Sequence, residues 1–100
     1  MPSVGARLVS TTCTTEVIIV RAADPELVVE CGGRPMAVAG DAVTRVPPRT
    51  GFDAGTELGK RYASANHDLE VLCVRAGAGT LSVEDEVLIV RSPKPLPSSD

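Results

Sequence analysis

The chain contains nearly the same strand sequence twice. "EVIIVRA" begins at Glu16 and "EVLCVRA" begins at Glu70, which sets an offset of 70 − 16 = 54 residues. When Glu16–Glu30 is aligned with Glu70–Glu84 at this offset, eight of the fifteen positions are identical. Self-similarity of this density within a chain of 100 residues indicates an internal duplication. The fold therefore has to accommodate two copies of one small unit.

Each copy is predicted to contain three short strands. Runs such as "VIIV" and "VLCV" are short, rich in β-branched residues and bounded by turn residues, which favours strands. Gly77 and Gly79 in "AGAGT" are expected to permit the positive φ of a turn. Because "VIIV" is apolar on both faces, its strand is expected to be buried on both sides. The prediction is an all-β fold, a small barrel or sandwich of two three-stranded meanders, with strands at Glu16–Arg21, Leu27–Glu30, Pro35–Val38, Glu70–Arg75, Thr80–Val83 and Val87–Arg91.

A chain of 100 residues suits a single domain with one modest core. We divide it into repeat one at about 10–38, a connecting segment at 39–61, repeat two at about 62–91 and a Pro-rich tail at 92–100. The connecting segment is rich in Gly, Pro and polar residues, and the tail has prolines at 93, 95 and 97. The connecting segment either binds a partner or contains strand pieces, for example in "AVTRV", and the tail is either a spacer or a recognition peptide. Our hypothesis is that both contact a protein partner or a second copy of the chain.

Composition excludes several classes of function. The net charge is −3, the basic residues are scattered, and only Phe52 and Tyr62 are aromatic, so nucleic-acid binding is not expected. No stretch approaches the ~20 apolar residues of a membrane span, and the N-terminus lacks the apolar run of a signal peptide. Three cysteines in such a chain indicate reduced thiols or metal ligands in a cytoplasmic protein.

The repeat resembles a known metal-binding module. "EVIIVRAADPELVVECGGRPMAV" looks like the latter part of desulforedoxin and of the N-terminal domain of desulfoferrodoxin, which are rubredoxin-like. "KRYASANHDLEVLCVRAGAGTLSVEDEVLIV" is similar to the same module, and together the two segments cover about 60 of the 100 residues. The resemblance implies a small β domain, duplicated in tandem, with one iron held by four cysteines. These are a C-x-x-C pair before the first strand and an adjacent pair in the knuckle; desulforedoxin itself is a homodimer.

Most of the ligand positions that the resemblance implies have lost their cysteines. The second position of the leading pair is Cys13 in copy one and His67 in copy two, since each lies three residues before the repeated Glu. Serines occupy the first position. At the knuckle, Glu30–Cys31 is aligned with Glu84–Asp85. In this alignment copy one carries two extra residues in "CGGRPMAV", which is compared with "DEVLIV" of copy two.

Two interpretations of the cysteines remain open. Cys13 and Cys31 could bind zinc together with His67 and a carboxylate, either Glu30 or Glu84, or could pair across a dimer into a four-Cys site. Alternatively, the knuckle is vestigial and no cofactor is bound. The third cysteine, Cys73, lies inside a strand, where a thiol commonly serves as a small apolar residue.

No catalytic set is apparent in the sequence. A Cys–His nucleophilic pair would need an orienting group and an oxyanion hole, and neither has a signature here. The sequence therefore predicts a non-catalytic, desulforedoxin-like β domain that acts as a protein-interaction or accessory subunit, for example of a larger metabolic enzyme. The alternative is a metal-binding (zinc or iron) or electron-transfer protein that uses Cys13 and Cys31.

Overall fold

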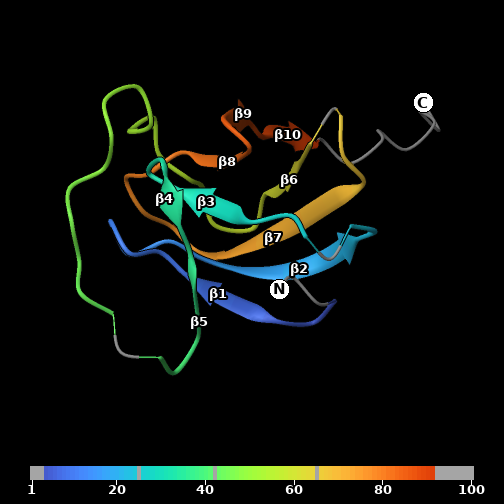
Figure 1. Cartoon of the computed structure of the whole chain (residues 1–100), viewed down its shortest axis with the longest axis horizontal. Helices are drawn as coiled ribbons and strands as arrows, with labels where there is room; N and C mark the ends of the chain where they lie inside the picture. The colour runs from blue at the N-terminus through green and yellow to red at the C-terminus, as the bar shows by residue number, and fades with distance from the viewer. Residues whose placement is uncertain (1–3, 25, 42, 65, 92–100) are drawn as a thin grey trace, which may run out of the picture.

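The all-β prediction is confirmed. A computed structural model describes residues 4–24, 26–41, 43–64 and 66–91, which contain ten β-strands and no helix (Figure 1). Accordingly, these ranges hold no helix with the length and apolar character to cross a membrane. The prolines at 93, 95 and 97, on which the predicted contact role of the tail rests, lie outside the described residues.

The strands form two antiparallel sheets, so the sandwich alternative describes the fold and the closed barrel does not. The six-stranded sheet has the order β10-β6-β7-β2-β1-β5, and the four-stranded sheet has the order β4-β3-β8-β9. The strands are β1 (Arg7–Val9), β2 (Glu16–Ala22), β3 (Val29–Cys31), β4 (Arg34–Pro35), β5 (Ala37–Val38), β6 (Arg61–Ala63), β7 (Leu69–Arg75), β8 (Leu81–Val83), β9 (Glu86–Val87) and β10 (Ile89–Arg91).

The two copies are related by a pseudo-twofold axis through the centre of both sheets. In each sheet the strand order is unchanged when β1–β5 are exchanged for β6–β10. At the centre of the six-stranded sheet Ile18 pairs with Leu72, a residue 72 − 18 = 54 positions away, so the repeat offset is confirmed for β2 and β7. Equivalent backbone hydrogen bonds recur in the two copies: Gly5 N–H to Ile19 O (2.8 Å) and Gly59 N–H to Cys73 O (2.9 Å), Ser10 N–H to Thr15 O (2.9 Å) and Ser64 N–H to Leu69 O (3.1 Å).

Each copy contributes five strands, whereas the sequence predicted three. The first strands, β1 and β6, were not predicted. The predicted third strands are each divided in two, at Met36 and at Leu88, because the chain there leaves one sheet for the other. β4 completes a hairpin with β3, whereas β5 pairs with β1 in the six-stranded sheet. The strands of one copy are therefore shared between both sheets and do not form a meander within one.

The register of the hairpins corrects the alignment at the knuckle. Glu30 pairs with Pro35 in copy one and Ser82 pairs with Val87 in copy two, so the offset here is 82 − 30 = 52. The structural equivalent of Cys31 is consequently Val83. The two extra residues of copy one lie in the loop between β2 and β3, and the expected match of Glu30–Cys31 with Glu84–Asp85 was wrong.

The same hairpin turn is made with different residues in the two copies. Gly32 and Gly33 have φ of 69° and 77°, and their equivalents Glu84 and Asp85 have φ of 48° and 65°. Positive φ is costly for residues with a Cβ, by about 1–2 kcal/mol each. The turn geometry is therefore retained in copy two without the glycines that favour it.

The core lies between the two sheets. Val17, Ile19, Val71 and Cys73 share one face of β2 and β7 and are fully buried. The opposite face, with Ile18, Val20, Leu72 and Val74, is only half-buried. The expectation that "VIIV" is buried on both sides was thus wrong for one face, because the four-stranded sheet covers the six-stranded sheet on one side only.

The connecting segment lies against the body of the protein through backbone hydrogen bonds. Between β5 and β6 the described residues contain no strand, only an isolated bridge between Thr56 and Gly77. Val46 N–H donates to Thr11 O (2.8 Å), and Arg49 N–H donates to Gly32 O (2.8 Å). In Figure 1 the segment forms a long arc at one end of the molecule.

Candidate functional site

A serine-based turn positions the candidate ligand in each copy. Ser10 Oγ accepts the backbone N–H of Cys13 at 3.1 Å, and Ser64 Oγ accepts that of His67 at 2.9 Å. Serine hydroxyls commonly stabilise such turns by bonding the backbone two or three residues ahead. The serines at the first ligand position therefore preserve the turn, whatever side chain follows at the second.

The structure brings two of the three predicted site residues together. Cys13 follows β1 in its turn, and Cys31 ends β3 just before the Gly32–Gly33 turn. Their sulfur atoms are 3.8 Å apart. Cys13 is 9% exposed and Cys31 is fully buried. Both are free thiols in van der Waals contact at one end of the core.

Cys13 has an environment that stabilises its thiolate. Thr15 Oγ1 lies 3.2 Å and Ser10 Oγ 3.4 Å from Cys13 Sγ, and the Gly79 N–H donates to the sulfur at 3.3 Å. Burial raises the pKa of Cys13, but the hydrogen bonds from these three residues together outweigh burial and lower the pKa from 9.0 to about 6. Cys13 is therefore mostly ionised at neutral pH, which makes it the nucleophilic sulfur of the pair.

The pKa of Cys31 is shifted in the opposite direction. Burial raises the pKa of Cys31 to about 11, and the neighbouring charge of Cys13 acts in the same direction. The pair at neutral pH is thus one thiolate beside one thiol. Cys73 is separate in role: burial raises its pKa, and its S–H bonds the Arg75 carbonyl at 3.2 Å within the core. The prediction of Cys73 as a small apolar core residue is confirmed by its burial.

Two glycines of copy two cover the sulfurs of copy one. Neither Gly77 nor Gly79 has positive φ, so the reason predicted for these glycines was wrong. A Cβ on Gly79 would lie 2.9 Å from Cys31 Sγ and 3.2 Å from Cys13 Sγ, and one on Gly77 would lie 2.8 Å from Cys13 Sγ. The glycines are needed because a side chain at either position would occupy the space of the thiols. The site is consequently built from both copies.

A cavity of about 410 Å³ reaches Cys13 from outside. Two arginines and one carboxylate line it, together with hydroxyl and apolar side chains. The carboxylate, Glu16, is bonded to Arg7 at 2.8 Å and to Arg75 at 3.3 Å. The lining residues are Val9, Ser10, Cys13, Thr14, Thr15, Glu16, Val43, Arg45 and Arg75.

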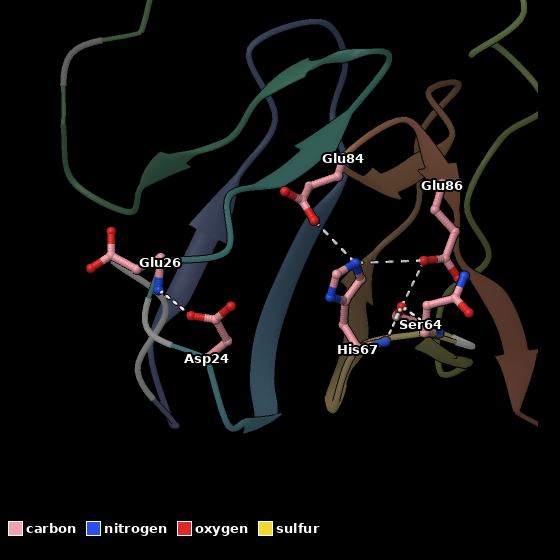
Figure 2. Close-up of polar contacts among 7 residues, drawn as sticks. Asp24, Glu26, Ser64, His67, Glu84 and Glu86 are labelled. Atoms are coloured by element: carbon pink, nitrogen blue, oxygen red, sulfur yellow. Dashed lines mark hydrogen bonds and ion pairs between the residues drawn. The ribbon is translucent and has the colours of Figure 1, made fainter.

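His67, the third predicted site residue, lies in a different cluster. Figure 2 shows its ring pointing at two carboxylates of the β8–β9 hairpin. His67 Nε2 is 3.1 Å from Glu84 Oε2 and 3.9 Å from Glu86 Oε1. Ser64 Oγ bonds the same Glu86 oxygen at 2.9 Å. His67 is therefore neither a base for Cys13 nor a partner of the two thiols in this arrangement.

The donor set does not fit the four-thiolate iron site that the resemblance implies. One chain supplies two sulfurs, and the nearest further groups are hydroxyls, which are poor ligands for a soft metal. The Glu30 carboxylate accepts a hydrogen bond from Ser82 at 3.4 Å. Across the four described ranges, no group of three or more His, Cys, Asp and Glu side chains is arranged to hold a metal ion.

Sequence reasoning missed the residues that set the reactivity of Cys13. Thr15 lies next to the repeated Glu, and its equivalent in copy two is Leu69, so the repeat gives no signal for it. Gly79 was recognised only as a turn residue. One sequence signal could have indicated close packing over Cys13. It is the pair of glycines in "AGAG", within a loop that is shorter in copy two than in copy one.

Comparison of the chain with protein-family models, with curated proteins and with solved structures returned no match. The likeness to the desulforedoxin module therefore rests on the quoted residues alone. Function has to be argued from the site and the surface.

Proposed function

We propose that the protein is a non-catalytic β domain that acts through protein contacts, as an accessory subunit of a larger metabolic enzyme or as a homo-oligomer. The observation that carries this proposal is the outer face of β2 and β7. Antiparallel sheets with one solvated face normally alternate apolar residues inside with polar residues outside. Here the outer face carries four half-buried aliphatic side chains, which we name the outer patch: Ile18, Val20, Leu72 and Val74.

The edge of the six-stranded sheet supports the same conclusion. β10 is its outermost strand on one side, and Ile89 and Val90 are 58% and 41% exposed there. An exposed apolar edge strand offers unpaired backbone groups to another chain. Exposed apolar residues on an edge strand are a feature of interaction sites in soluble proteins.

A site-specific crosslinking experiment tests the proposal. A photoreactive amino acid replaces Leu72 in the outer patch, and in a control it replaces Val28, which is 52% exposed in the loop before β3. We expect a discrete adduct in cells from position 72 and none from position 28. The adduct should disappear when Ile18→Lys is added to the position-72 protein. Equal labelling at both positions, or labelling at neither, would show that the outer patch has no partner.

The second candidate function is metal binding at Cys13 and Cys31. It is favoured by the contact of the two sulfurs, 3.8 Å apart, and it requires further ligands from a second chain. Elemental analysis of protein purified without chelators and without an affinity tag tests it. Near-stoichiometric zinc or iron that is lost in Cys13→Ala would establish this function in place of the first. Metal-free protein that melts cooperatively would exclude it.

A further inference from the structure

The thiol pair and the cavity together define a site that the proposed protein-contact function does not use. Of the two cysteines, Cys13 is among the residues that line the cavity, whereas Cys31 is not and is fully buried. A reagent entering the cavity can reach Cys13, and Cys13 in turn can be reached from within by Cys31. This arrangement of an accessible and a buried sulfur in contact is the geometry of an attacking and a resolving thiol.

We propose that Cys13 and Cys31 form a reversible dithiol–disulfide centre, in which Cys13 attacks a low-molecular-weight disulfide that enters the cavity and Cys31 resolves the product. In the first step the Cys13 thiolate bonds one sulfur of the disulfide RSSR, whose S–S bond breaks and releases one RS⁻. In the second step Cys31 loses its proton and bonds Cys13 Sγ, and the second RS⁻ leaves. Counted from the thiolate–thiol pair, the protein loses two electrons and the one proton of Cys31. RSSR is reduced to two RS⁻, which become two RSH by taking up that proton and one from water.

The surroundings of each sulfur suit its role. The Gly79 N–H donates to Cys13 Sγ at 3.3 Å, and Thr15 Oγ1 lies 3.2 Å from the same sulfur, so both groups are placed to stabilise the thiolate that attacks. Closing the bond requires the sulfurs to approach from 3.8 Å to about 2.05 Å. Gly77 and Gly79 place no side chain over the sulfurs that would obstruct this movement.

The charges of the cavity indicate which disulfides it favours. Glu16 is already neutralised by Arg7, which lies outside the lining, and by Arg75. With the Cys13 thiolate counted, Glu16 and Cys13 stand against Arg45, Arg75 and the adjacent Arg7, so the surroundings of the cavity carry a net positive charge. A disulfide that carries carboxylates, such as oxidised glutathione, should react faster there than cystamine, whose amines are positive.

The test treats the reduced full-length chain with oxidised glutathione, then alkylates the remaining thiols and measures the intact mass. Wild type should lose two alkylatable thiols and retain no glutathione. Cys31→Ser should stop at a stable mixed disulfide on Cys13. Cys13→Ser should react at least tenfold more slowly than wild type, whereas the matched control Cys73→Ser should behave as wild type.

Several results would overturn the proposal. If wild type retains glutathione on Cys13 while Cys31 stays alkylatable, Cys31 does not resolve. If Cys13→Ser reacts at the wild-type rate, Cys13 is not the attacking sulfur. Should Cys13→Ser fail to fold by circular dichroism, wild type and Cys31→Ser still decide the question, since identical products from these two would exclude a resolving thiol.

A second arm compares oxidised glutathione with cystamine. The ratio of their rates should exceed one in wild type and fall several-fold in Arg45→Ala. A ratio at or below one in wild type, or one that Arg45→Ala leaves unchanged, would overturn the carboxylate preference. Both reagents are small disulfides, so this arm separates charge selection from thiol chemistry.

Discussion

The two serine-based turns of the protein have the same backbone and different chemistry. In copy one the turn presents Cys13 to a second thiol in a nearly closed part of the core. In copy two it presents His67, with 27% of its side chain exposed, to Glu84 and Glu86. The turn itself depends on one serine hydroxyl in each copy and has been retained. The chemistry depends on what the hairpin and the opposite copy bring to the turn, and these parts have diverged.

The loops that cross from one sheet to the other account for part of this divergence. The loop after β7 is the shorter one, and its glycines lie over the thiols. The loop after β2 is two residues longer (54 − 52 = 2), and Glu26 N–H there donates to Asp24 Oδ1 at 2.9 Å (Figure 2). A loop with polar side chains of its own cannot provide the close backbone cover that Gly77 and Gly79 provide. The two sites therefore differ in cover as well as in ligand.

The largest expected effect is the difference in alkylation rate between the two thiols of copy one, Cys13 and Cys31. At pH 7 with limiting iodoacetamide, Cys13 should be alkylated about 100-fold faster than Cys31, because its far larger thiolate fraction outweighs its lower intrinsic nucleophilicity. Peptide mass analysis after short reaction times measures the ratio. Equal labelling of the two would show that the hydrogen bonds to Cys13 do not stabilise its thiolate.

The same lowered pKa predicts how stability depends on pH. The folded pKa of Cys13 is about 6 and the ordinary value is 9.0, so the thiolate contributes stability that is fully present above pH 9. This contribution is lost as the pH falls toward 6, because the unfolded chain then binds a proton that the folded chain does not. Denaturant unfolding of wild type and Cys13→Ser should therefore diverge from pH 6 to pH 9. Parallel curves would contradict the prediction.

Among these substitutions, adding a side chain at Gly79, over the two thiols, should lower the free energy of unfolding the most. Gly79→Ala places a Cβ 2.9 Å from both Cys31 Sγ and the Gly32 backbone nitrogen, which cannot move aside cheaply. Overpacking of this kind costs about 1–3 kcal/mol, and we expect the upper part of that range. Thermal unfolding measures it. The exposed neighbour gives a control, since Ala78→Ser should change stability by less than about 0.5 kcal/mol.

The equivalent glutamates of the two copies, Glu70 and Glu16, should differ less in their contribution to the free energy of unfolding. Glu70 has 7% of its side chain exposed and bonds Arg61 at 3.3 Å and Arg91 at 2.8 Å, whereas Glu16 has 17% exposed. Glu70→Gln should cost about 1–3 kcal/mol, since hydrogen bonds to a charged and buried group are lost. Glu16→Gln should cost about 1 kcal/mol or less. Denaturant midpoints in the reverse order would show that burial does not distinguish the two pairs.

The smallest loss of stability is expected when the imidazole of His67 is removed. His67→Ala should cost less than about 1 kcal/mol, because its contact with Glu84, which is 65% exposed, is mostly solvated. Ser64→Ala should cost more than His67→Ala, since it removes the acceptor that holds the turn. Chemical denaturation of the two variants at one pH gives the comparison. A larger loss from His67→Ala would mean that copy two depends on its side-chain cluster and not on its turn.

The sequence predicted the central strands well because the repeat is densest there. β2 and β7 were placed within one residue at each end. β1 and β6 were missed because three-residue strands have too few positions to show a period. The 54-residue offset nonetheless extends into them, with Gly5 matching Gly59, Arg7 matching Arg61 and Ser10 matching Ser64.

The thiol site was predicted only in part. Cys13 and Cys31 were identified together because the resemblance marks both positions. The separation of His67 from them follows from the pseudo-twofold axis, which places the turn of copy two elsewhere. The hairpin alignment failed because three residues are identical at the 54-residue offset although the loop between the strands differs in length by two residues. These are Leu27, Val29 and Glu30, which are aligned with Leu81, Val83 and Glu84. Cover by the opposite copy is a tertiary feature with no local sequence pattern.

The exchange of strands between the sheets has a consequence for how the chain reaches its fold. The central pair joins Ile18 to Leu72, and the inner pair of the smaller sheet joins Glu30 to Ser82, so both sheets are closed by contacts between distant positions. Folds dominated by such pairings form slowly, on the order of milliseconds to seconds. During synthesis at roughly 5–20 residues per second, the apolar strand β2 waits about 3–11 s for β7 to be made. In that interval β1 can pair with one edge of "VIIV". The edge that β7 later occupies stays open, so β2 is the segment of the nascent chain that most needs protection by a chaperone.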